Sequence, residues 1–238
     1  MLVLSVVGRR TIRKRERLKP NTGAGSGDAP RDPEGRRGRL KYSDHVASKR
    51  EHLTGAAQVK GTMIQAHLNW VAKRGIDPAT ALAAHLSAET AKLVSHNVLA
   101  TSWVSLSSLI AVDRAIAAVV KGNPDDVFRE LGRFSATSNL SGIYAGFVSD
   151  EPHLFFEKQA RLHDRFQNFG ASAYKELGPR AGQMRLTKYT EYSPVFCLSA
   201  IGYYQGALET MKAPGPIRVR ETSCTCAGDE ACVFDLSW

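Results

Sequence analysis

The sequence predicts an α+β domain in which N-terminal helices come first and a small antiparallel sheet with one packed helix follows. Two observations support this fold class. Between Thr62 and Asn168, apolar residues recur at the three- and four-residue spacing of amphipathic helices. From Ser172 onward, short alternating segments separated by glycine and proline replace that spacing, which is typical of strands and hairpins. Helices first and strands late is the order of an α+β domain rather than of alternating βαβ units.

Local signals mark several helix ends in the first part. Asp77-Pro78 combines an N-cap residue with proline at the first helical position. Gly75, Gly122-Asn123-Pro124 and Gly170 each follow a segment with helical spacing, as expected after a helix. The expected helices cover Thr62–Lys73, a segment from Pro78, Leu106–Val120, Asp125–Phe134 and Pro152–Asn168.

The strands are expected in the late part of the chain. Ser172–Leu177 and Gln183–Tyr189 alternate in polarity on either side of a turn that contains glycine and proline, which predicts a hairpin. Pro194–Met211 returns to helical spacing and has proline at its first position. Ile217–Arg220 and Val233–Trp238 are the two expected closing strands.

The formal net charge of +9 lies entirely in the leading segment. Residues 1–50 contain 14 Lys and Arg and 5 Asp and Glu, whereas residues 51–238 contain 18 of each sign. The leading segment is poor in large apolar residues, so burial cannot offset the entropy of ordering it. We therefore expect a disordered basic tail, residues 1–57, and a single ligand-binding domain, residues 58–238. Nucleic acid would bind only through this tail; a solvated tail, or sequence upstream of the true start codon, is the alternative.

No segment predicts insertion into a membrane. Leu2–Val7 is apolar but too short for a transmembrane helix, and no basic residue precedes it as in a signal peptide. No other stretch approaches 18 uninterrupted apolar residues. We expect a cytoplasmic protein without a membrane span.

All four cysteines lie within the last 42 residues, at positions 197, 224, 226 and 232. A disulfide framework is uncommon without a secretion signal, and clustered thiolates favour zinc. Glu221 and Cys224 are an odd number of residues apart, so a bulge or turn must lie between them if both face one site. Cys226 would share a strand face with Cys224 and is a rival ligand. Buried thiols that only pack are the alternative.

The same residues carry a resemblance to a known domain. Phe196–Tyr203, Gly206-Ala207, Glu221–Cys224 and Gly228–Cys232 resemble the 4-vinyl reductase domain, especially that of phenol-sensing, enhancer-binding activators. In that group, a helix cysteine, a glutamate and two further cysteines hold a structural zinc. The ligands that the resemblance implies here are Cys197, Glu221, Cys224 and Cys232.

Residues 58–238 also resemble a myxobacterial paralogous family of unassigned function, for example at Lys60-Gly61 and Ser102-Trp103. The vinyl reductase resemblance implies a fold similar to that of heme-associated NO-signalling domains and Golgi transport-particle subunits, with an apolar pocket and often a homodimer. The heme-associated relatives carry a Tyr-x-Ser-x-Arg signature, whereas Tyr189 is followed here by Thr190 and Glu191. We therefore do not expect heme.

Aromatic residues are concentrated where such a pocket would lie. Of the 19 Phe, Tyr and Trp residues, 14 lie between Phe128 and Tyr204. An ordinary core is one interpretation. The other, favoured by the resemblance, is an enclosed apolar cavity of roughly 300 Å³ or more, bordered by at least three of our candidates. The candidate ligand-binding residues are Phe155, Phe169, Tyr189, Tyr192, Phe196 and Tyr203.

These observations favour a non-catalytic sensor that binds an apolar small molecule, contains a structural zinc and signals to an unidentified protein partner. An enzyme or accessory in tetrapyrrole (vinyl) reduction is one alternative, and a structural protein-interaction module is another. The seven histidines form no recognisable catalytic signature, and no Gly-rich dinucleotide motif is present, so the enzyme is less favoured.

Overall fold

The computed structural model describes residues 49–238, and the predicted tail, residues 1–57, lies mostly outside these residues. Its last part, residues 49–57, differs from the prediction because it is hydrogen bonded to the domain. The Arg50 N–H donates to the Cys226 carbonyl at 2.6 Å, and the Ala57 N–H donates to the Glu191 carboxylate at 2.8 Å. Ala57 is itself buried. Residues 49–57 therefore pack with the domain, which the expected boundary at residue 58 did not include.

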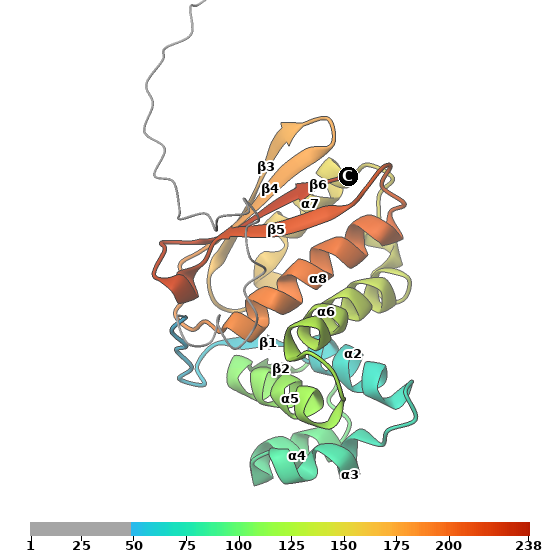
Figure 1. The fold of residues 1–238 in the computed structure, drawn as a ribbon, viewed down its shortest axis with the longest axis vertical. Helices are drawn as coiled ribbons and strands as arrows, with labels where there is room; N and C mark the ends of the chain where they lie inside the picture. Colours follow the sequence, from blue (N-terminus) through green and yellow to red (C-terminus); the bar gives the residue numbers. More distant parts are fainter. Residues whose placement is uncertain (1–48) are drawn as a thin grey trace, which may run out of the picture. The chain divides into compact units, whose positions relative to one another are not determined.

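The late part of the chain forms a four-stranded antiparallel sheet in the order β3-β4-β6-β5 (Figure 1). The strands are β3 (Ala171–Gly178), β4 (Ala181–Thr187), β5 (Arg218–Ser223) and β6 (Cys232–Ser237). The predicted hairpin is β3 and β4, which pair from Ala171 with Thr187 onward. Buried and less buried residues alternate along β4, because one face of the sheet is covered and the other is not.

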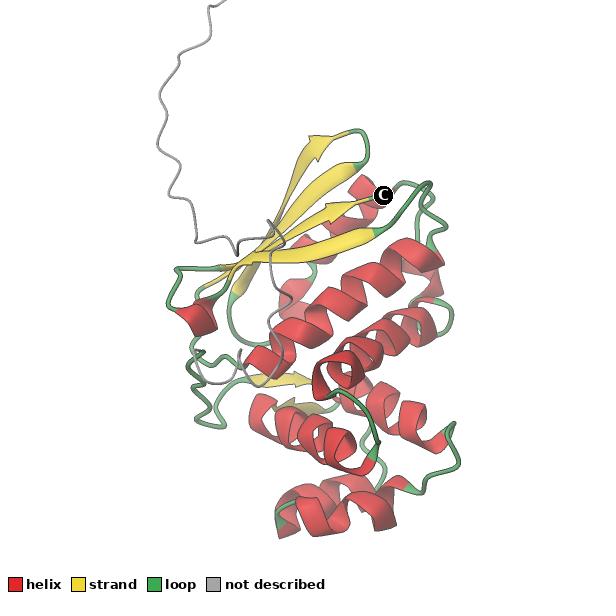
Figure 2. Cartoon of the chain, in the orientation of Figure 1, coloured by secondary structure: helices red, strands yellow, loops and turns green. Residues whose placement is uncertain are grey.

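Helices cover one face of this sheet and extend away from it (Figure 2). α8 (Pro194–Thr210) packs on β5 and β6, α7 (Pro152–Arg161) packs on β3, and α6 (Pro124–Leu140) packs along α8. α6 continues beyond the predicted end at Phe134. α7 ends at Arg161, before the predicted end at Asn168, and a short 3-10 turn (His163–Arg165) follows it.

The remaining helices form a second layer beside α6. They are α2 (Gly61–Ala72), α3 (Pro78–Leu82), α4 (Ala88–Ser95) and α5 (Leu106–Val119), with 3-10 turns at Ala83–His85, Ala145–Phe147 and Thr225–Ala227. The predicted cap is present, because the Asp77 side chain accepts the Thr80 N–H at 3.1 Å. The sequence did not predict α4 or the short antiparallel pair of β1 (Gln58–Lys60) and β2 (Trp103–Ser105).

Glycines bring α6 and α8 into very close contact. A Cβ added at Gly132 would lie 1.8 Å from the Ser199 carbonyl oxygen, and a Cβ added at Gly202 would lie 1.8 Å from the Arg129 carbonyl oxygen. Only residues without a side chain allow the two backbones to approach in this way. The contact fixes the position of α8, the helix that carries several candidate site residues.

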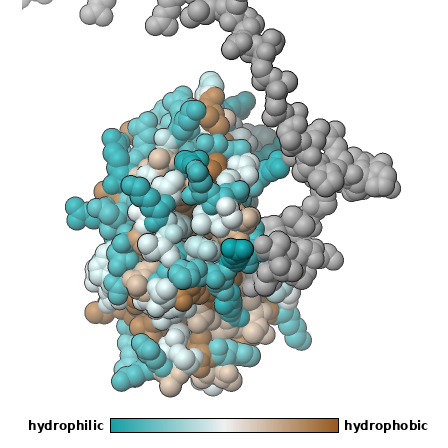
Figure 3. All heavy atoms as spheres, turned by 90° about the vertical axis from the view of Figure 1, so that its left-hand side faces the viewer, coloured by the Kyte–Doolittle hydropathy of each residue, from teal (hydrophilic) through white to brown (hydrophobic). Residues whose placement is uncertain are grey.

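The α+β prediction is confirmed, and the described residues contain two buried clusters. One lies among α2, α5 and α6, and the other lies between the sheet, α7 and α8 and contains all four cysteines. On the face shown in Figure 3, hydrophilic residues predominate and hydrophobic ones are scattered among them. Within residues 49–238, no helix has the length and apolar character needed to cross a membrane.

Candidate metal site and ligand cavity

The four predicted metal ligands meet where α8 faces the ends of β5 and β6. One donor atom from each of Cys197, Glu221, Cys224 and Cys232 lies within 4.8 Å of the donor atoms of the others. All three cysteines are buried. The pairing of β5 with β6 shifts register between Glu221 and Ser223. This is the irregularity that the odd spacing of Glu221 and Cys224 required.

The turn after β5 positions the thiols of this four-residue cluster. Gly228 takes a φ of 100°, a left-handed conformation that glycine adopts without strain. The Asp229 carboxylate accepts the Cys224 N–H at 2.7 Å, which closes the loop between Cys224 and Cys232. The Thr225 N–H in turn points at the Cys232 sulfur at 3.4 Å. Such outer hydrogen bonds orient metal ligands and stabilise thiolates.

The spacing of the sulfur atoms fits a tetrahedral metal ion. The Cys197 Sγ lies 3.7 Å from the Cys224 Sγ and 3.8 Å from the Cys232 Sγ. Zinc binds thiolates at about 2.3 Å, and two sulfurs at that distance are about 3.8 Å apart in a tetrahedron. Glu221 Oε1 is buried without a hydrogen-bond partner among the described residues, so the cluster also contains an unused oxygen donor. The donor set of three sulfurs and one oxygen suits zinc.

Charge is unevenly distributed over this cluster. Burial and the neighbouring Cys224 raise the pKa of Glu221 to about 7. Hydrogen bonds with Cys197 and then with the other cysteines lower the pKa of Cys224. The hydrogen bond between Cys197 and Cys224 raises the pKa of Cys197. The Lys49 ammonium lies 3.0 Å from Glu221 Oε2 and is the cation nearest this carboxylate among the described ion pairs. This contact differs from the prediction, because the sequence places Lys49 in the disordered tail.

Cys226 is buried close to the cluster but is not one of its four members. It lies in the 3-10 turn between Cys224 and Gly228, and its carbonyl accepts the N–H of Arg50. The strand geometry that would have made it a rival ligand is absent, since β5 ends at Ser223.

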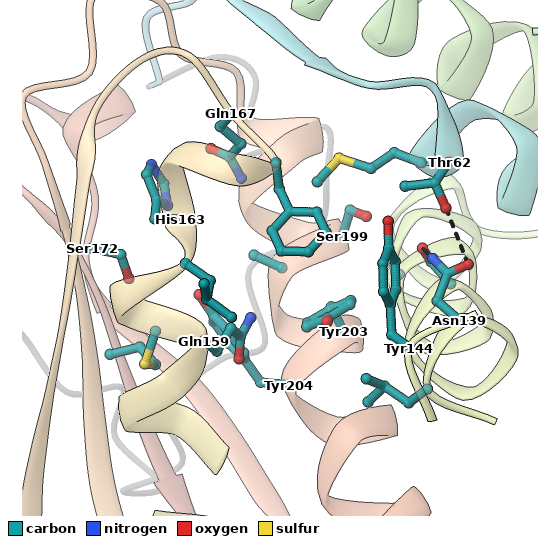
Figure 4. A pocket seen from close by; sticks show the side chains of 18 of the residues that line it. Thr62, Asn139, Tyr144, Gln159, His163, Gln167, Ser172, Ser199, Tyr203 and Tyr204 are labelled. Carbon is teal, nitrogen blue, oxygen red and sulfur yellow. Dashed lines mark hydrogen bonds between the residues drawn. The ribbon is translucent and has the colours of Figure 1, made fainter. Parts of the chain in front are cut away.

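A cavity of about 140 Å³ lies between α2, α6, α7, α8 and the covered face of the sheet (Figure 4). Three predicted residues border it: Phe155, Phe196 and Tyr203. Met184 and Leu186, two residues apart on β4, form its floor. The volume is about half of the expected 300 Å³, and further aromatic side chains, including Tyr144 and Tyr204, also border the space.

The other three predicted pocket residues, Phe169, Tyr189 and Tyr192, do not border this cavity, which corrects the prediction. Phe169 and Tyr189 pack on each other with ring centroids 5.1 Å apart. Tyr192 packs on His52, with ring centroids 6.0 Å apart, and the two residues form a backbone bridge. These rings therefore serve the core and the attachment of residues 49–57.

Several polar residues that the sequence did not single out also border the cavity. Figure 4 shows Tyr144 from the loop after α6, Gln159 from α7 and Tyr203 from α8 around the same space. Burial raises the pKa of Tyr203 to about 12, so this hydroxyl stays protonated. Gln159 Oε1 is buried and has no hydrogen-bond partner among the described residues. No local pattern indicates Tyr144 or Gln159, since polar residues on helices and in loops are usually solvated.

The sequence matches no protein-family model and no curated protein. The fold is similar to that of solved H-NOX proteins. An H-NOX protein from S. oneidensis in the Fe(II)NO ligation state matches with a TM-score of 0.56 and 15% identity, over 75% of this chain and 98% of that chain. An oxygen-binding H-NOX domain related to soluble guanylate cyclases matches with a TM-score of 0.53 and 12% identity, over 74% and 91%.

A mutant H-NOX protein from K. algicida in the unliganded Fe(II) state matches with a TM-score of 0.56 and 10% identity, over 75% of this chain and 95% of that chain. At these identities the likeness defines the fold alone. The described chain is thus an α+β domain with the fold of H-NOX proteins. The resemblance to the 4-vinyl reductase domain remains a prediction.

Proposed function

We propose that this chain is a non-catalytic sensor module that binds an apolar small molecule and is stabilised by a structural zinc ion. One observation carries the proposal: α8 contributes to both sites. Its Cys197 belongs to the metal cluster, while Phe196 and Tyr203 border the cavity. Filling of the cavity is therefore coupled, through one helix, to the cross-linked ends of β5 and β6.

The donor set supports a structural rather than a catalytic role for the metal. Cys197, Glu221, Cys224 and Cys232 supply four ligands, and a four-coordinate site has no open position for a substrate. Its ligands come from α8, β5, the following turn and β6, so zinc would cross-link segments that lie apart in the sequence. Zinc bound in this way contributes directly to the free energy of folding.

The size and lining of the cavity support a small apolar ligand. A cavity of about 150 Å³ lined by aliphatic and aromatic side chains accepts benzene in another protein, and the present cavity has about 140 Å³. Phe155, Phe196, Met184 and Leu186 give it an apolar wall. A compound with one aromatic ring, or two small fused rings, matches these dimensions better than a fatty acyl chain does.

Heme is the group that the fold suggests, because one of the similar structures comes from a study of heme distortion in the H-NOX family. The residues of this chain do not fit it. A heme contains four pyrrole rings, whereas the cavity has the volume of a one-ring site. Two histidines border the cavity: His163 already donates its Nε2–H to the Phe169 carbonyl at 3.0 Å, and His67 is bonded to Asp113 through Nδ1, so the volume of the cavity is what disfavours heme. The same size argument disfavours tetrapyrrole reduction.

A thermal-shift screen of the purified full-length chain tests the proposal. Toluene, indole, dodecanoate and hemin would be compared at a hundredfold excess over their dissociation constants. A ligand that binds only the folded state should add about 2.7 kcal/mol, which raises the melting temperature by about 5–10 °C. We expect this shift with toluene or indole and not with hemin.

The matched control is Ala200→Phe, which fills the cavity from α8. It should abolish the shift by the small aromatics while the protein still melts cooperatively. A shift with hemin alone would favour the heme interpretation. A protein that no compound stabilises would favour the structural interaction module.

A further inference from the structure

A buried histidine–carboxylate pair lies beside the cavity. The His67 Nδ1 on α2 is 2.6 Å from the Asp113 Oδ1 on α5. The two residues are only 2% and 1% exposed, and they are surrounded by the apolar cluster of the N-terminal helices. Polar groups are costly to bury, so a pair like this one requires a specific partner for every atom that can bond. His67 also borders the cavity.

The pair fixes which nitrogen of His67 faces a ligand. His67 Nδ1 and Asp113 Oδ1 share this hydrogen bond, in which an imidazole N–H donates and a carboxylate oxygen accepts. In the neutral ring Nε2 then has a free lone pair. Within residues 49–238 no side chain or backbone group donates to this nitrogen. A carboxylate orients metal-ligating histidines in the same way, by holding one ring nitrogen and leaving the other available.

The cavity contains a second acceptor of the same kind. Gln159 Oε1 is buried and has no partner among the described residues. The Thr62 hydroxyl is already used, because it donates to the Asn139 amide oxygen at 3.3 Å, as Figure 4 shows. The Tyr203 and Tyr204 hydroxyls also border the cavity and can donate as well as accept. Within residues 49–238, His67 Nε2 and Gln159 Oε1 are acceptor atoms at the cavity to which no neighbouring group donates.

We propose that the cavity selects apolar ligands that carry a hydrogen-bond donor, an N–H or O–H group, and that His67 Nε2 accepts this hydrogen bond. Asp113 is a positioning residue that acts through His67. The inference rests on the proposed function, since it specifies the chemistry of a ligand for the same cavity. It adds a ligand contact from α2, an element that the predicted pocket did not include.

Indole and benzofuran form a matched pair of probes. They have the same size and shape, but the N–H donor of indole is replaced in benzofuran by an oxygen acceptor. Benzoate serves as a third probe, because a doubly protonated His67 would prefer an anion. Isothermal titration of the full-length chain measures each dissociation constant. One buried hydrogen bond predicts roughly tenfold tighter binding of indole than of benzofuran.

Two variants assign the effect to a residue. His67→Phe should bring the ratio of the two dissociation constants close to 1, whereas Gln159→Met should leave most of it. Long-range ¹H–¹⁵N correlation spectra of the wild-type chain report the tautomer of His67 without any substitution. We expect the proton on Nδ1 and a change of the Nε2 resonance when indole is added.

The outcomes separate this inference from the proposed function. If indole and benzofuran bind equally, or benzoate binds best, the donor-selective site is wrong while the apolar cavity stands. If the ratio falls only in Gln159→Met, the role of His67 is wrong. If none of the three probes binds, the proposed function fails, and the inference fails with it.

Discussion

The substitution Gly202→Ala tests whether the close contact between α6 and α8 positions the site residues on α8. The new Cβ would lie 1.8 Å from the Arg129 carbonyl oxygen, and real Cβ contacts begin near 3.0 Å, so the two backbones must separate by at least 1.2 Å. Overpacking of a core typically costs about 1–3 kcal/mol, and this clash is at the upper end because backbone cannot yield as a side chain does.

Alanine recovers about 1 kcal/mol through its higher helix propensity, so we expect a net loss of about 2 kcal/mol. For a domain of this size, that loss lowers the melting temperature by about 4–8 °C. Differential scanning calorimetry measures it. Because the same displacement moves Cys197 and Tyr203, the variant should also bind zinc and indole more weakly.

Two further glycines serve as graded controls. Gly206→Ala should cost less, since its Cβ would lie 2.6 Å from the Arg133 carbonyl oxygen. Gly178→Ala, which meets nothing within 4 Å, should change little. If Gly202→Ala melts at or above the wild-type temperature, or if the three variants are indistinguishable, the close approach of α6 and α8 is not as described.

Three further predictions concern the metal cluster, the cavity and the leading segment. Cys232→Ser should lose zinc and melt at least about 5 °C lower, whereas Cys226→Ser should keep zinc. Elemental analysis and calorimetry of both proteins measure this. Equal zinc loss in the two variants would contradict the assigned ligands. Tyr203→Ala should weaken indole binding about tenfold or more by titration, because a cavity wall is removed, and unchanged affinity would place the ligand elsewhere. Deleting residues 1–48 should leave the melting temperature within about 2 °C and abolish any salt-sensitive DNA binding, while a larger loss of stability would show that this segment packs on the domain.

Local chemistry explains why much of the fold could be predicted. Asp77-Pro78 and Ser193-Pro194 each place a capping side chain before a proline, and both cap a helix in the structure. The hairpin of β3 and β4 follows from alternation around a short turn. β1 and β2 could not be predicted because three residues are too few for a periodic signal, and their pairing joins segments far apart in the sequence.

The clustering of four cysteines near one end of the chain predicted a candidate metal site, and the odd spacing of Glu221 and Cys224 predicted a bulge between them. The choice of Cys197, Glu221, Cys224 and Cys232 over Cys226 came from the resemblance to the 4-vinyl reductase domain. Lys49 could not be predicted, because nothing in the sequence near it indicates a carboxylate partner at Glu221. Residues that meet across such separations are fixed by tertiary packing alone.

The cavity could be predicted only in part. Phe155, Phe196 and Tyr203 border it, but Phe169, Tyr189 and Tyr192 do not. Helical or strand spacing identifies the buried face of an element and cannot say whether that face meets a neighbour or a space. A lone histidine such as His67 is usually solvated or satisfied within the core. His67 differs from such a histidine because it pairs with Asp113 on another helix and borders the cavity, where we propose that it contacts a ligand.

Native mass spectrometry of the purified full-length chain measures directly whether zinc and a small aromatic compound are bound. We expect a mass that exceeds that of the polypeptide by one zinc ion, and by a small aromatic compound when one is supplied. Denaturation should release both, and the number of chains in the native ion tests the predicted homodimer. A bare polypeptide that takes up neither zinc nor aromatic compound, or a mass increase equal to that of heme, would contradict a zinc-stabilised sensor of small apolar ligands.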